Sequence, residues 1–323
     1  MRKIILTLLI LLISISVSAQ RYVEPETLAD GDRYFADIDG VSIYYIARGD
    51  VNNPAIMLIH GFGGSTFTWR DNIDAFIDAG YYVVALDLPP FGLSDKNPDI
   101  AYSHQDYADY VAGLMDTLDI DSATIAGHSM GGSVTSYFVL NYPERVDNLI
   151  FVAGGVFDRA QDNNSEDESE SDGGSPLGIL STIDLESESA VNILRISLVP
   201  ATFASLIESA YFDPSIMTDE VVAGYARPLQ IENWTEGFIA YLLADDAPAI
   251  TLSEVASVAD MPVLIIWGEE DTWVSIAMGH AMNEAFSNIA MMTYAEVEHV
   301  PMEENIEQFD VFIAVTNDDE ANI

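Results

Sequence analysis

One serine of this chain stands in a sequence that is typical of nucleophilic catalysis. Ser129 is the central residue of Gly-His-Ser-Met-Gly at 127–131. A short apolar run, residues 123–126, comes directly before this pentapeptide, and a pattern of helical length follows it. A strand-turn-helix of this kind pushes the serine hydroxyl out of a sheet, and side chains at the glycine positions would clash with neighbouring backbone. The pattern predicts that Ser129 is a nucleophile; a plain Gly/Ser turn is the alternative.

A serine hydroxyl becomes a good nucleophile when a histidine accepts its proton, and the chain has five histidines. Four of them are unsuitable because they adjoin the serine, end a predicted strand or lie in helical patterns: His128, His60, His104 and His280. His299 follows the apolar run 291–297 in a predicted loop before the last helical pattern. We therefore expect His299 to be the general base.

The base needs a carboxylate that orients it. The chain has 53 acidic residues, so the residue type alone does not identify this carboxylate, and its position relative to a predicted strand must be used. The apolar run 262–267 predicts a buried strand, and Gly-Glu-Glu-Asp at 268–271 follows it. Catalytic groups of α/β sheets gather at the carboxyl ends of the strands. Asp271 is therefore the expected acid of a Ser-His-Asp triad, and Glu270 is the alternative.

Acyl-transfer chemistry also needs hydrogen-bond donors for the oxyanion that develops on the substrate. The backbone N–H of Met130, directly after the nucleophile, is one candidate. The N–H of Phe62 is the other, because the glycines of His-Gly-Phe-Gly-Gly at 60–64 let this loop approach a substrate closely. Phosphate binding is the alternative for such a loop, but the lysine-containing pattern of phosphate loops is missing from it.

The elements that must position these residues are short and alternate in type. Two alternating segments between residues 34 and 49 flank Asp39-Gly40, which predicts an antiparallel hairpin. Apolar runs that predict buried parallel strands lie at 55–59, 81–88, 123–126, 149–153 and 262–267. Patterns that predict helices lie at 69–78, 104–118, 130–141, 275–286 and 303–315. This order predicts an α/β fold with a mostly parallel sheet and helices on both faces.

The alternation stops between residues 156 and 249, where helical patterns rich in aromatic residues replace it. We expect a helical cap inserted between two parts of the core, residues 20–155 and 250–323. The acidic segment 162–175 of this insertion is expected to be a solvated loop; a calcium site is the alternative, although its spacing does not match an EF-hand. Three aromatic side chains are expected to line an apolar substrate pocket: Trp234, Phe238 and Trp273.

The N-terminus has the pattern of a secretory signal peptide. Two cations precede the apolar run 4–15, and Val-Ser-Ala at 17–19 supplies small residues for cleavage near Ala19. The run is shorter than the ~20 residues that span a bilayer, so we expect residues 1–19 to be removed and no stable membrane anchor to remain. Export to the periplasm or the medium is the expected localisation.

The charge of the chain excludes several classes of partner. It carries 11 Lys and Arg against 53 Asp and Glu, a formal net charge of −42. Nucleic acids and anionic lipid surfaces are therefore not expected partners. The chain has no cysteine, which excludes disulfides, thiolate metal sites and a cysteine nucleophile. The expected assembly is a monomer or a small homo-oligomer.

Five segments, in order, resemble the α/β-hydrolase superfamily, in the group with a helical cap. They are similar to its oxyanion loop, its D-x-P-G-x-G-x-S-D loop, its nucleophile turn, its acid loop and its terminal H-x-P-x-x-E-x-P-E-x-F segment (residues 60–64, 87–95, 127–132, 268–271 and 299–309). The resemblance covers about residues 34–315, apart from the cap. It implies a mostly parallel eight-stranded sheet, the triad order Ser129, Asp271, His299, and chemistry without a cofactor or a metal ion.

Three positions depart from the pattern of the superfamily. Pro90 replaces a usual glycine, Ile306 replaces a usual proline, and Glu298 stands where a glycine commonly precedes the histidine. None of these changes removes a catalytic atom. A carboxylate beside the base could perturb the protonation of His299.

The type of nucleophile narrows the reactions that this fold hosts. Haloalkane dehalogenases and epoxide hydrolases of the superfamily use an aspartate where this chain has Ser129; esterases, lipases and C–C bond hydrolases use serine. With the signal peptide, this favours a secreted hydrolase that cleaves small apolar carboxylic esters through a seryl acyl-enzyme. The alternatives are a C–C bond hydrolase of the meta-cleavage type, an aminopeptidase or perhydrolase, and a non-catalytic binding protein on the same fold.

The composition also predicts a salt-dependent stability, like that of proteins from salty environments. Cleavage after Ala19 would leave 9 Lys and Arg against 53 acids, a net charge of −44 on 304 residues. Repulsion among these charges is screened when the Debye length falls to about 3 Å in 1 M salt. The thermal unfolding midpoint should therefore be higher in molar sodium chloride than in dilute buffer. Equal midpoints in the two solutions would contradict this.

Overall fold

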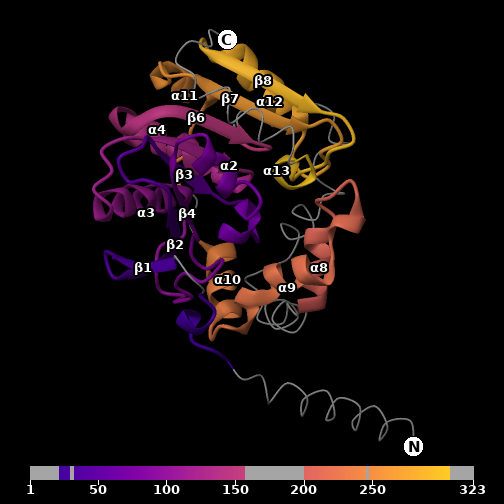
Figure 1. Ribbon diagram of the computed structural model, residues 1–323. Coiled ribbons are helices and arrows are strands. Elements are labelled where there is room, and N and C mark those ends of the chain that lie inside the picture. Colours follow the sequence, from indigo (N-terminus) through magenta and orange to yellow (C-terminus); the bar gives the residue numbers. More distant parts are fainter. Residues whose placement is uncertain (1–21, 30–32, 157–199, 245–246, 306–323) are drawn as a thin grey trace, which may run out of the picture.

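The computed structural model describes residues 22–29, 33–156, 200–244 and 247–305. Its core is one eight-stranded sheet with the strand order β1-β2-β4-β3-β5-β6-β7-β8 (Figure 1). The strands are β1 (Arg33–Ile38), β2 (Val41–Arg48), β3 (Ala55–Ile59), β4 (Tyr82–Leu86), β5 (Ala123–His128), β6 (Val146–Val152), β7 (Val263–Gly268) and β8 (Ile289–Tyr294). From β4 to β8 all neighbours are parallel, which confirms the predicted fold class.

The sheet begins with the predicted antiparallel hairpin. Ile38 pairs with Val41, and the two residues between them, Asp39 and Gly40, both have positive φ angles, of 52° and 86°. Turns of this type match the twist of the flanking strands. β2 then pairs antiparallel with β4, the outermost strand of the parallel part of the sheet.

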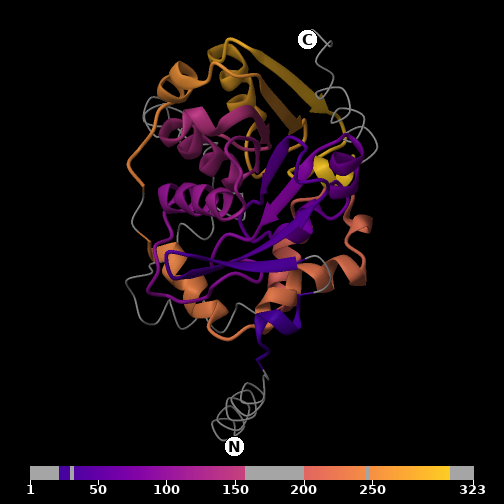
Figure 2. The same cartoon turned by 60° about the vertical axis from the view of Figure 1, so that its left-hand side comes forward.

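Helices cover both faces of the sheet (Figure 2). On one face α3 (His104–Thr117), α4 (Met130–Asn141), α11 (Leu252–Val258) and α12 (Ile276–Ala285) pack side by side. On the other face lie α2 (Ile73–Asp78), the 3-10 turn η2 (Thr66–Trp69) and α13 (Pro301–Glu304). Strands β3, β4, β5 and β7 are buried along their whole length, which explains why most of their residues are apolar.

The predicted helix over 69–78 is wrong in its first turn. Ser65 caps a 3-10 turn that ends at Trp69, and α2 begins only at Ile73. The break coincides with a long-range contact, because Asn72 is fully buried and donates a hydrogen bond from Nδ2 to the carbonyl of Met302, 3.0 Å away. This contact attaches the segment to α13.

A further layer of helices lies beside the loops that follow β3 and β4. It contains α8 (Pro200–Glu208), α9 (Asp219–Ala226), η4 (Pro214–Ile216), η5 (Arg227–Gln230) and α10 (Trp234–Leu243) (Figure 1). We call residues 200–244 the helical layer. A Cβ at Gly63 would meet Phe203 of α8 at 3.4 Å, and one at Gly237 of α10 would meet Pro90 at 2.9 Å. The helical layer therefore packs against the carboxyl end of the sheet.

Several predicted features lie outside the described residues. They are the signal peptide at 1–19, the acidic segment at 162–175 and the part of the last predicted helix beyond Asn305. Within the described ranges, no helix combines the length and the apolarity that crossing a bilayer requires.

Candidate active site

Ser129 occupies the sharp turn between β5 and α4. Its φ and ψ angles are 52° and −119°, a backbone conformation that a non-glycine residue adopts only when its surroundings enforce it. Two glycines make this turn possible by close approach. A Cβ at Gly61 would lie 2.8 Å from the Cβ of Ser129, and a Cβ at Gly131 would lie 2.5 Å from the carbonyl oxygen of Ile59. The serine is thereby held against the loop that follows β3.

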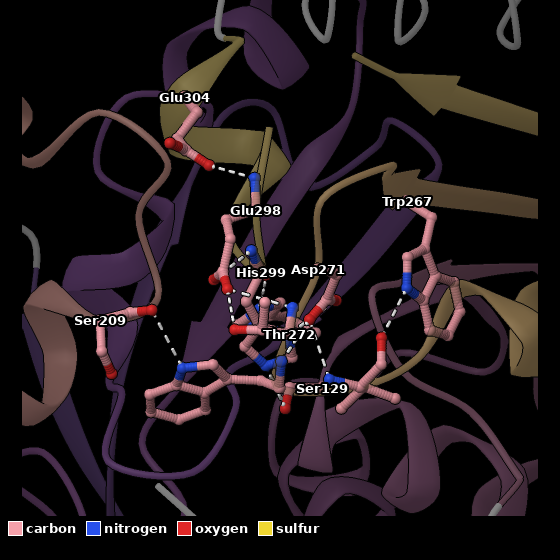
Figure 3. A network of polar contacts seen from close by, with 11 residues as sticks. Ser129, Ser209, Trp267, Asp271, Thr272, Glu298, His299 and Glu304 are labelled. Carbon is pink, nitrogen blue, oxygen red and sulfur yellow. Dashed lines mark hydrogen bonds and ion pairs between the residues drawn. The ribbon is translucent and has the colours of Figure 1, made fainter. Parts of the chain in front are cut away.

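The structure brings Ser129, His299 and Asp271 together in one chain of hydrogen bonds (Figure 3). The Oγ of Ser129 lies 2.8 Å from Nε2 of His299, and Nδ1 of His299 lies 2.9 Å from Oδ2 of Asp271. The side chains of His299 and Asp271 are 2% and 0% exposed. With Nδ1 protonated and bonded to the carboxylate, Nε2 is free to accept the serine proton.

Two N–H groups of the loop after β7 hold one oxygen of the Asp271 carboxylate. Its Oδ1 accepts hydrogen bonds from the N–H groups of Trp273 and Val274, at 2.9 and 2.8 Å. Oδ2 is thereby left to face the histidine. Glu270, the alternative acid, contacts Val297 instead: its Oε2 accepts a hydrogen bond from the N–H of that residue at 3.1 Å. The geometry therefore favours Asp271 as the partner of His299.

Backbone and ring contacts hold His299 in place. Its N–H donates to the carbonyl of Ala210 and to Oε2 of Glu298, each at 3.1 Å, and the ring of Trp273 stacks on the imidazole with ring centroids 5.2 Å apart. The carbonyl of His299 lies 2.8 Å from Nε2 of His128. Burial and the neighbouring His299 hold the pKa of His128 well below its usual value, so that ring is neutral and donates Nε2–H to the carbonyl.

Glu298 joins the loop of the base to the loop of the acid. Its Oε2 accepts from the N–H of His299, and its Oε1 accepts from the N–H of Thr272 at 3.0 Å and from the Thr272 hydroxyl (Figure 3). Both oxygens are thus engaged with the two loops that carry the base and the acid. Sequence reasoning placed Glu298 beside the base but did not predict this bridging contact.

A second buried carboxylate connects the base loop to the helical layer. Glu303 is 3% exposed and forms an ion pair with Arg70, with Nη1 2.6 Å from Oε2. The hydroxyl of Tyr211 donates to the same oxygen at 2.6 Å, and the hydroxyl of Tyr225 donates to Oε1. Burial raises the pKa of Glu303, and the Arg70 guanidinium opposes that shift. Sequence reasoning missed this cluster because Arg70, Tyr211, Tyr225 and Glu303 are far apart in the chain.

The two predicted oxyanion donors flank the serine. Phe62 follows Gly61, which contacts Ser129, and Met130 opens α4 directly after it. Within the described part of the chain, neither N–H donates a hydrogen bond to another residue. Both N–H groups therefore remain candidates for contact with a substrate oxygen.

The three residues predicted to line a substrate pocket lie at two different places in the structure. Trp234 and Phe238 line a small cavity of about 20 Å³ beside Gly63 and Gly64. Trp273 is not among the residues that line this cavity, because its ring lies on His299 and its Nε1 donates to the carbonyl of Ser209 at 3.2 Å. Trp273 therefore positions the base, whereas the other two face the loop that follows β3.

His60 ties this loop to the loop after β4. Its Nδ1 donates to the carbonyl of Gly61 at 2.7 Å, and its Nε2 accepts from the N–H of Leu88 at 2.9 Å. Complete burial lowers the pKa of His60 from 6.5 to about 4. The ring is neutral in the folded protein and orients the segment that carries the Phe62 N–H.

The charged groups of the described residues include no set of three or more histidine and carboxylate side chains arranged to hold a metal ion. The chemistry that the described residues display is that of a hydroxyl nucleophile, an imidazole and a carboxylate. This arrangement is the one that acyl-transferring hydrolases use.

Comparison with known proteins gives the family. The family model described as the alpha/beta hydrolase fold matches residues 54–306, and the chain belongs to this family. An uncharacterised hydrolase of Bacillus subtilis, YugF, is 28% identical over 281 residues, covering 86% of this chain and 94% of the relative. A 2-hydroxy-6-oxononadienedioate/2-hydroxy-6-oxononatrienedioate hydrolase of Burkholderia vietnamiensis is 28% identical over 261 residues, covering 80% and 84% of the two chains.

Solved structures agree with this assignment of the fold. The chain is similar to the meta-cleavage product hydrolase CumD of Pseudomonas fluorescens, with a TM-score of 0.69 and 23% identity. The likeness covers 90% of this chain and 98% of the other. The resemblance to the α/β-hydrolase superfamily that the sequence motifs indicated is thus confirmed.

The two candidate acids can be separated by matched substitutions. Asp271→Asn keeps the size of the side chain but removes the charge that orients and stabilises the histidine, so kcat should fall by about 10³- to 10⁴-fold. Glu270→Gln, the control, should lower kcat by less than about threefold. Steady-state rates of both purified variants, on whichever substrate the wild type turns over, test the assignment. A near-normal rate for Asp271→Asn would refute it.

The buried neutral His60 predicts a pH dependence of stability. Its pKa is about 4 in the folded protein and near 6.5 when unfolded, so only the unfolded state takes up this proton between those values. The contribution is fully present above pH 6.5, and about 3 kcal/mol of it is lost as the pH falls toward 4. Urea unfolding of His60→Gln across this range should show a flatter pH dependence than the wild type. The exposed His280, changed to Gln, is the control; identical slopes for all three proteins would contradict the prediction.

Proposed function

We propose that the protein is a serine hydrolase that cleaves its substrate through an acyl-enzyme on Ser129. The observation that carries this proposal is the continuous chain of hydrogen bonds from Ser129 through His299 to Asp271, all three side chains being buried. The strained backbone of Ser129 supports it, because such strain is maintained where it serves a mechanism.

In the proposed mechanism each group carries out one step. His299 Nε2 takes the hydroxyl proton as Ser129 Oγ attacks the substrate carbonyl, and the N–H groups of Phe62 and Met130 stabilise the oxyanion. When the tetrahedral intermediate collapses, the protonated histidine gives its proton to the leaving group. A water molecule, deprotonated by the same nitrogen, then attacks the acyl-serine and releases the acid. Asp271 stays ionised throughout and stabilises the imidazolium.

For the substrate we propose first a carbon–carbon bond next to a ketone, in a vinylogous diketone that carries a carboxylate. Support comes from the curated relatives, among them the 2-hydroxy-6-oxononadienedioate hydrolase of Burkholderia vietnamiensis, whose substrate is named as an oxo dicarboxylic acid. The leaving group of such a reaction is a carbon atom that must be protonated. The buried His299–Asp271 pair can deliver that proton to a leaving atom above Ser129.

A carboxylic ester is the second candidate, and an aromatic cluster favours it. The ring of Phe62 lies 5.7 Å from that of Phe91 and 5.6 Å from that of Phe238, measured between centroids, and Tyr241 lies 6.0 Å away. These rings surround the loop that supplies an oxyanion donor, and they suit an apolar acyl or aryl group. The cavity of about 20 Å³ beside them holds roughly one water molecule, so an acyl group would have to displace these rings.

We also propose the domain organisation and localisation that the sequence indicates. Residues 156–249 would form a cap over the site, with the core at 20–155 and 250–323. The contacts of Phe203, Ile207 and Gly237 with the loops after β3 and β4 support this role for the helical layer. Removal of residues 1–19 would release an exported enzyme.

One pair of assays tests the proposal. In molar salt, the purified protein is given a p-nitrophenyl ester series from acetate to palmitate and, separately, a 2-hydroxy-6-oxo-dienoate. Ser129→Ala should lower the rate on the true substrate by about 10⁴-fold or more, because it removes the nucleophile and leaves the fold intact.

The outcomes separate the two substrate classes. A high rate on the dienoate and a low rate on every ester supports the carbon–carbon bond. The reverse supports an ester, and the preferred chain length then measures the acyl pocket. A rate that Ser129→Ala leaves unchanged on both substrates would refute the serine mechanism.

A further inference from the structure

Five consecutive residues of the helical layer each form a hydrogen bond with the segments that carry the acid and the base. They are residues 209–213, which lie between the end of α8 and the start of η4 and which we call the connecting segment. Their partners are Trp273, in the loop that carries the acid, and His299, Glu303 and Glu304, in the segment that carries the base. The helical layer is therefore joined to both catalytic loops at one place.

The first two contacts of the connecting segment lie around the imidazole. The carbonyl of Ser209 accepts a hydrogen bond from Nε1 of Trp273 at 3.2 Å, and the ring of Trp273 is stacked on that of His299 with 19° between the ring planes (Figure 3). The carbonyl of Ala210 accepts from the N–H of His299 itself, at 3.1 Å. The N–H of Trp273 donates to Oδ1 of Asp271 at 2.9 Å. The connecting segment therefore contacts the base directly and reaches the acid through one residue.

The other three contacts are made with two carboxylates that follow the base in the chain. The hydroxyl of Tyr211 donates to Oε2 of Glu303 at 2.6 Å. The N–H groups of Phe212 and Asp213 donate to Oε1 of Glu304, at 2.6 and 3.2 Å. Both carboxylates lie in α13, so this helix is attached to the helical layer by side-chain contacts alone at these positions.

Glu304 uses its two oxygens for two different parts of the chain. Oε1 accepts from the connecting segment, whereas Oε2 accepts from the N–H of Glu298 at 2.7 Å (Figure 3). Glu298 directly precedes His299. One carboxylate therefore joins the main chain of the helical layer to the main chain beside the base. A glutamine at this position could accept from only one of the two parts, because an amide has one acceptor oxygen.

The loop that carries the base depends on such contacts because it has no regular structure of its own. Residues 295–300, between β8 and α13, form neither a helix nor a strand. Backbone groups that are buried outside regular structure need other partners, and these partners determine the path of the chain. The N–H groups of Glu298 and His299 find theirs in Glu304 and in the carbonyl of Ala210.

We propose that the connecting segment positions the catalytic base, with Trp273 and Glu304 as its positioning residues. Through them the helical layer holds His299 where its Nε2 lies 2.8 Å from the hydroxyl oxygen of Ser129. This geometry matters for the rate, since a displacement of about 1 Å can cost about 100-fold. The inference rests on the proposed function, because it concerns the base of that reaction.

The test is the rate at which a fluorophosphonate labels Ser129, a reaction that needs the base but no knowledge of the substrate. Trp273→Phe keeps a ring that can stack on His299 but loses the Nε1 donor to Ser209, and it should slow labelling by about tenfold. Glu304→Ala loses both of its links and should slow labelling by about tenfold or more. Glu304→Gln keeps one acceptor, so its rate should fall between those of the wild type and Glu304→Ala.

A spectroscopic readout separates positioning from a merely structural role. The Nδ1 proton of His299, bonded to Asp271, gives a downfield proton NMR signal, and this signal should shift or weaken in Trp273→Phe and Glu304→Ala. A substitution that only loosens the fold lowers the urea midpoint, but it leaves the signal and the labelling rate of the folded protein unchanged.

Glu269→Gln is the matched control. It removes one charge from the same loop as Trp273, at an exposed position where Oε1 of Glu269 accepts from the hydroxyl of Thr293 at 2.9 Å. Because this contact lies outside the connecting segment, the labelling rate should stay within about twofold of the wild type.

The outcomes distinguish this inference from the proposed function. If the wild type is labelled at Ser129, and Trp273→Phe and Glu304→Ala keep its rate and its Nδ1 signal, the inference is overturned and the proposed function stands. An equal slowing in Glu269→Gln also overturns the inference. A wild type that is not labelled at Ser129 overturns both. If Glu304→Ala does not fold, Glu304→Gln and Trp273→Phe decide the question by the same readouts.

Discussion

The close approach of three backbone segments at the carboxyl end of the sheet is the constraint on which the rest of the site depends. The end of β3, the turn at Ser129 and the start of α4 meet without intervening side chains, since a Cβ at Gly61 or Gly131 would collide with the neighbouring chain. This contact accompanies the strained backbone of Ser129 and brings the loop that carries Phe62 against the turn that Met130 follows. The apolar, buried strands on either side make the arrangement rigid.

Two of the many acidic residues are buried, and their carboxylates connect separate segments of the chain. Glu298 bridges the loops of the base and the acid, and Glu303 connects the segment after His299 to Arg70 and to two tyrosines of the helical layer. Each buried carboxylate is satisfied by several donors, which is the condition under which a buried charge persists. The base is thus held from the sheet side and from the helical layer at once.

Short sequence motifs were sufficient to predict those features of the structure that involve only neighbouring residues in the chain. The turn at Ser129, the hairpin at Asp39-Gly40 and the parallel strands follow from short motifs whose geometry is nearly fixed by residue type. Asp271 and His299 follow β7 and β8, and the loops after these parallel strands lie at the same edge of the sheet as Ser129. What the sequence could not show depends on three-dimensional packing: the start of α2, the stacking of Trp273 on His299, and the pairing of Arg70 with Glu303. These contacts join side chains that are far apart in the chain, and no sequence pattern links such residues.

The central claim is that Ser129 is a nucleophile activated by His299. Its most direct test is covalent labelling with a fluorophosphonate, which reacts with an activated serine, followed by peptide mass spectrometry to locate the adduct. The account predicts one adduct, on Ser129, and a labelling rate reduced by orders of magnitude in His299→Ala, because the hydroxyl then loses the base that accepts its proton. An unlabelled protein, an adduct on another residue, or equal labelling of His299→Ala would contradict it.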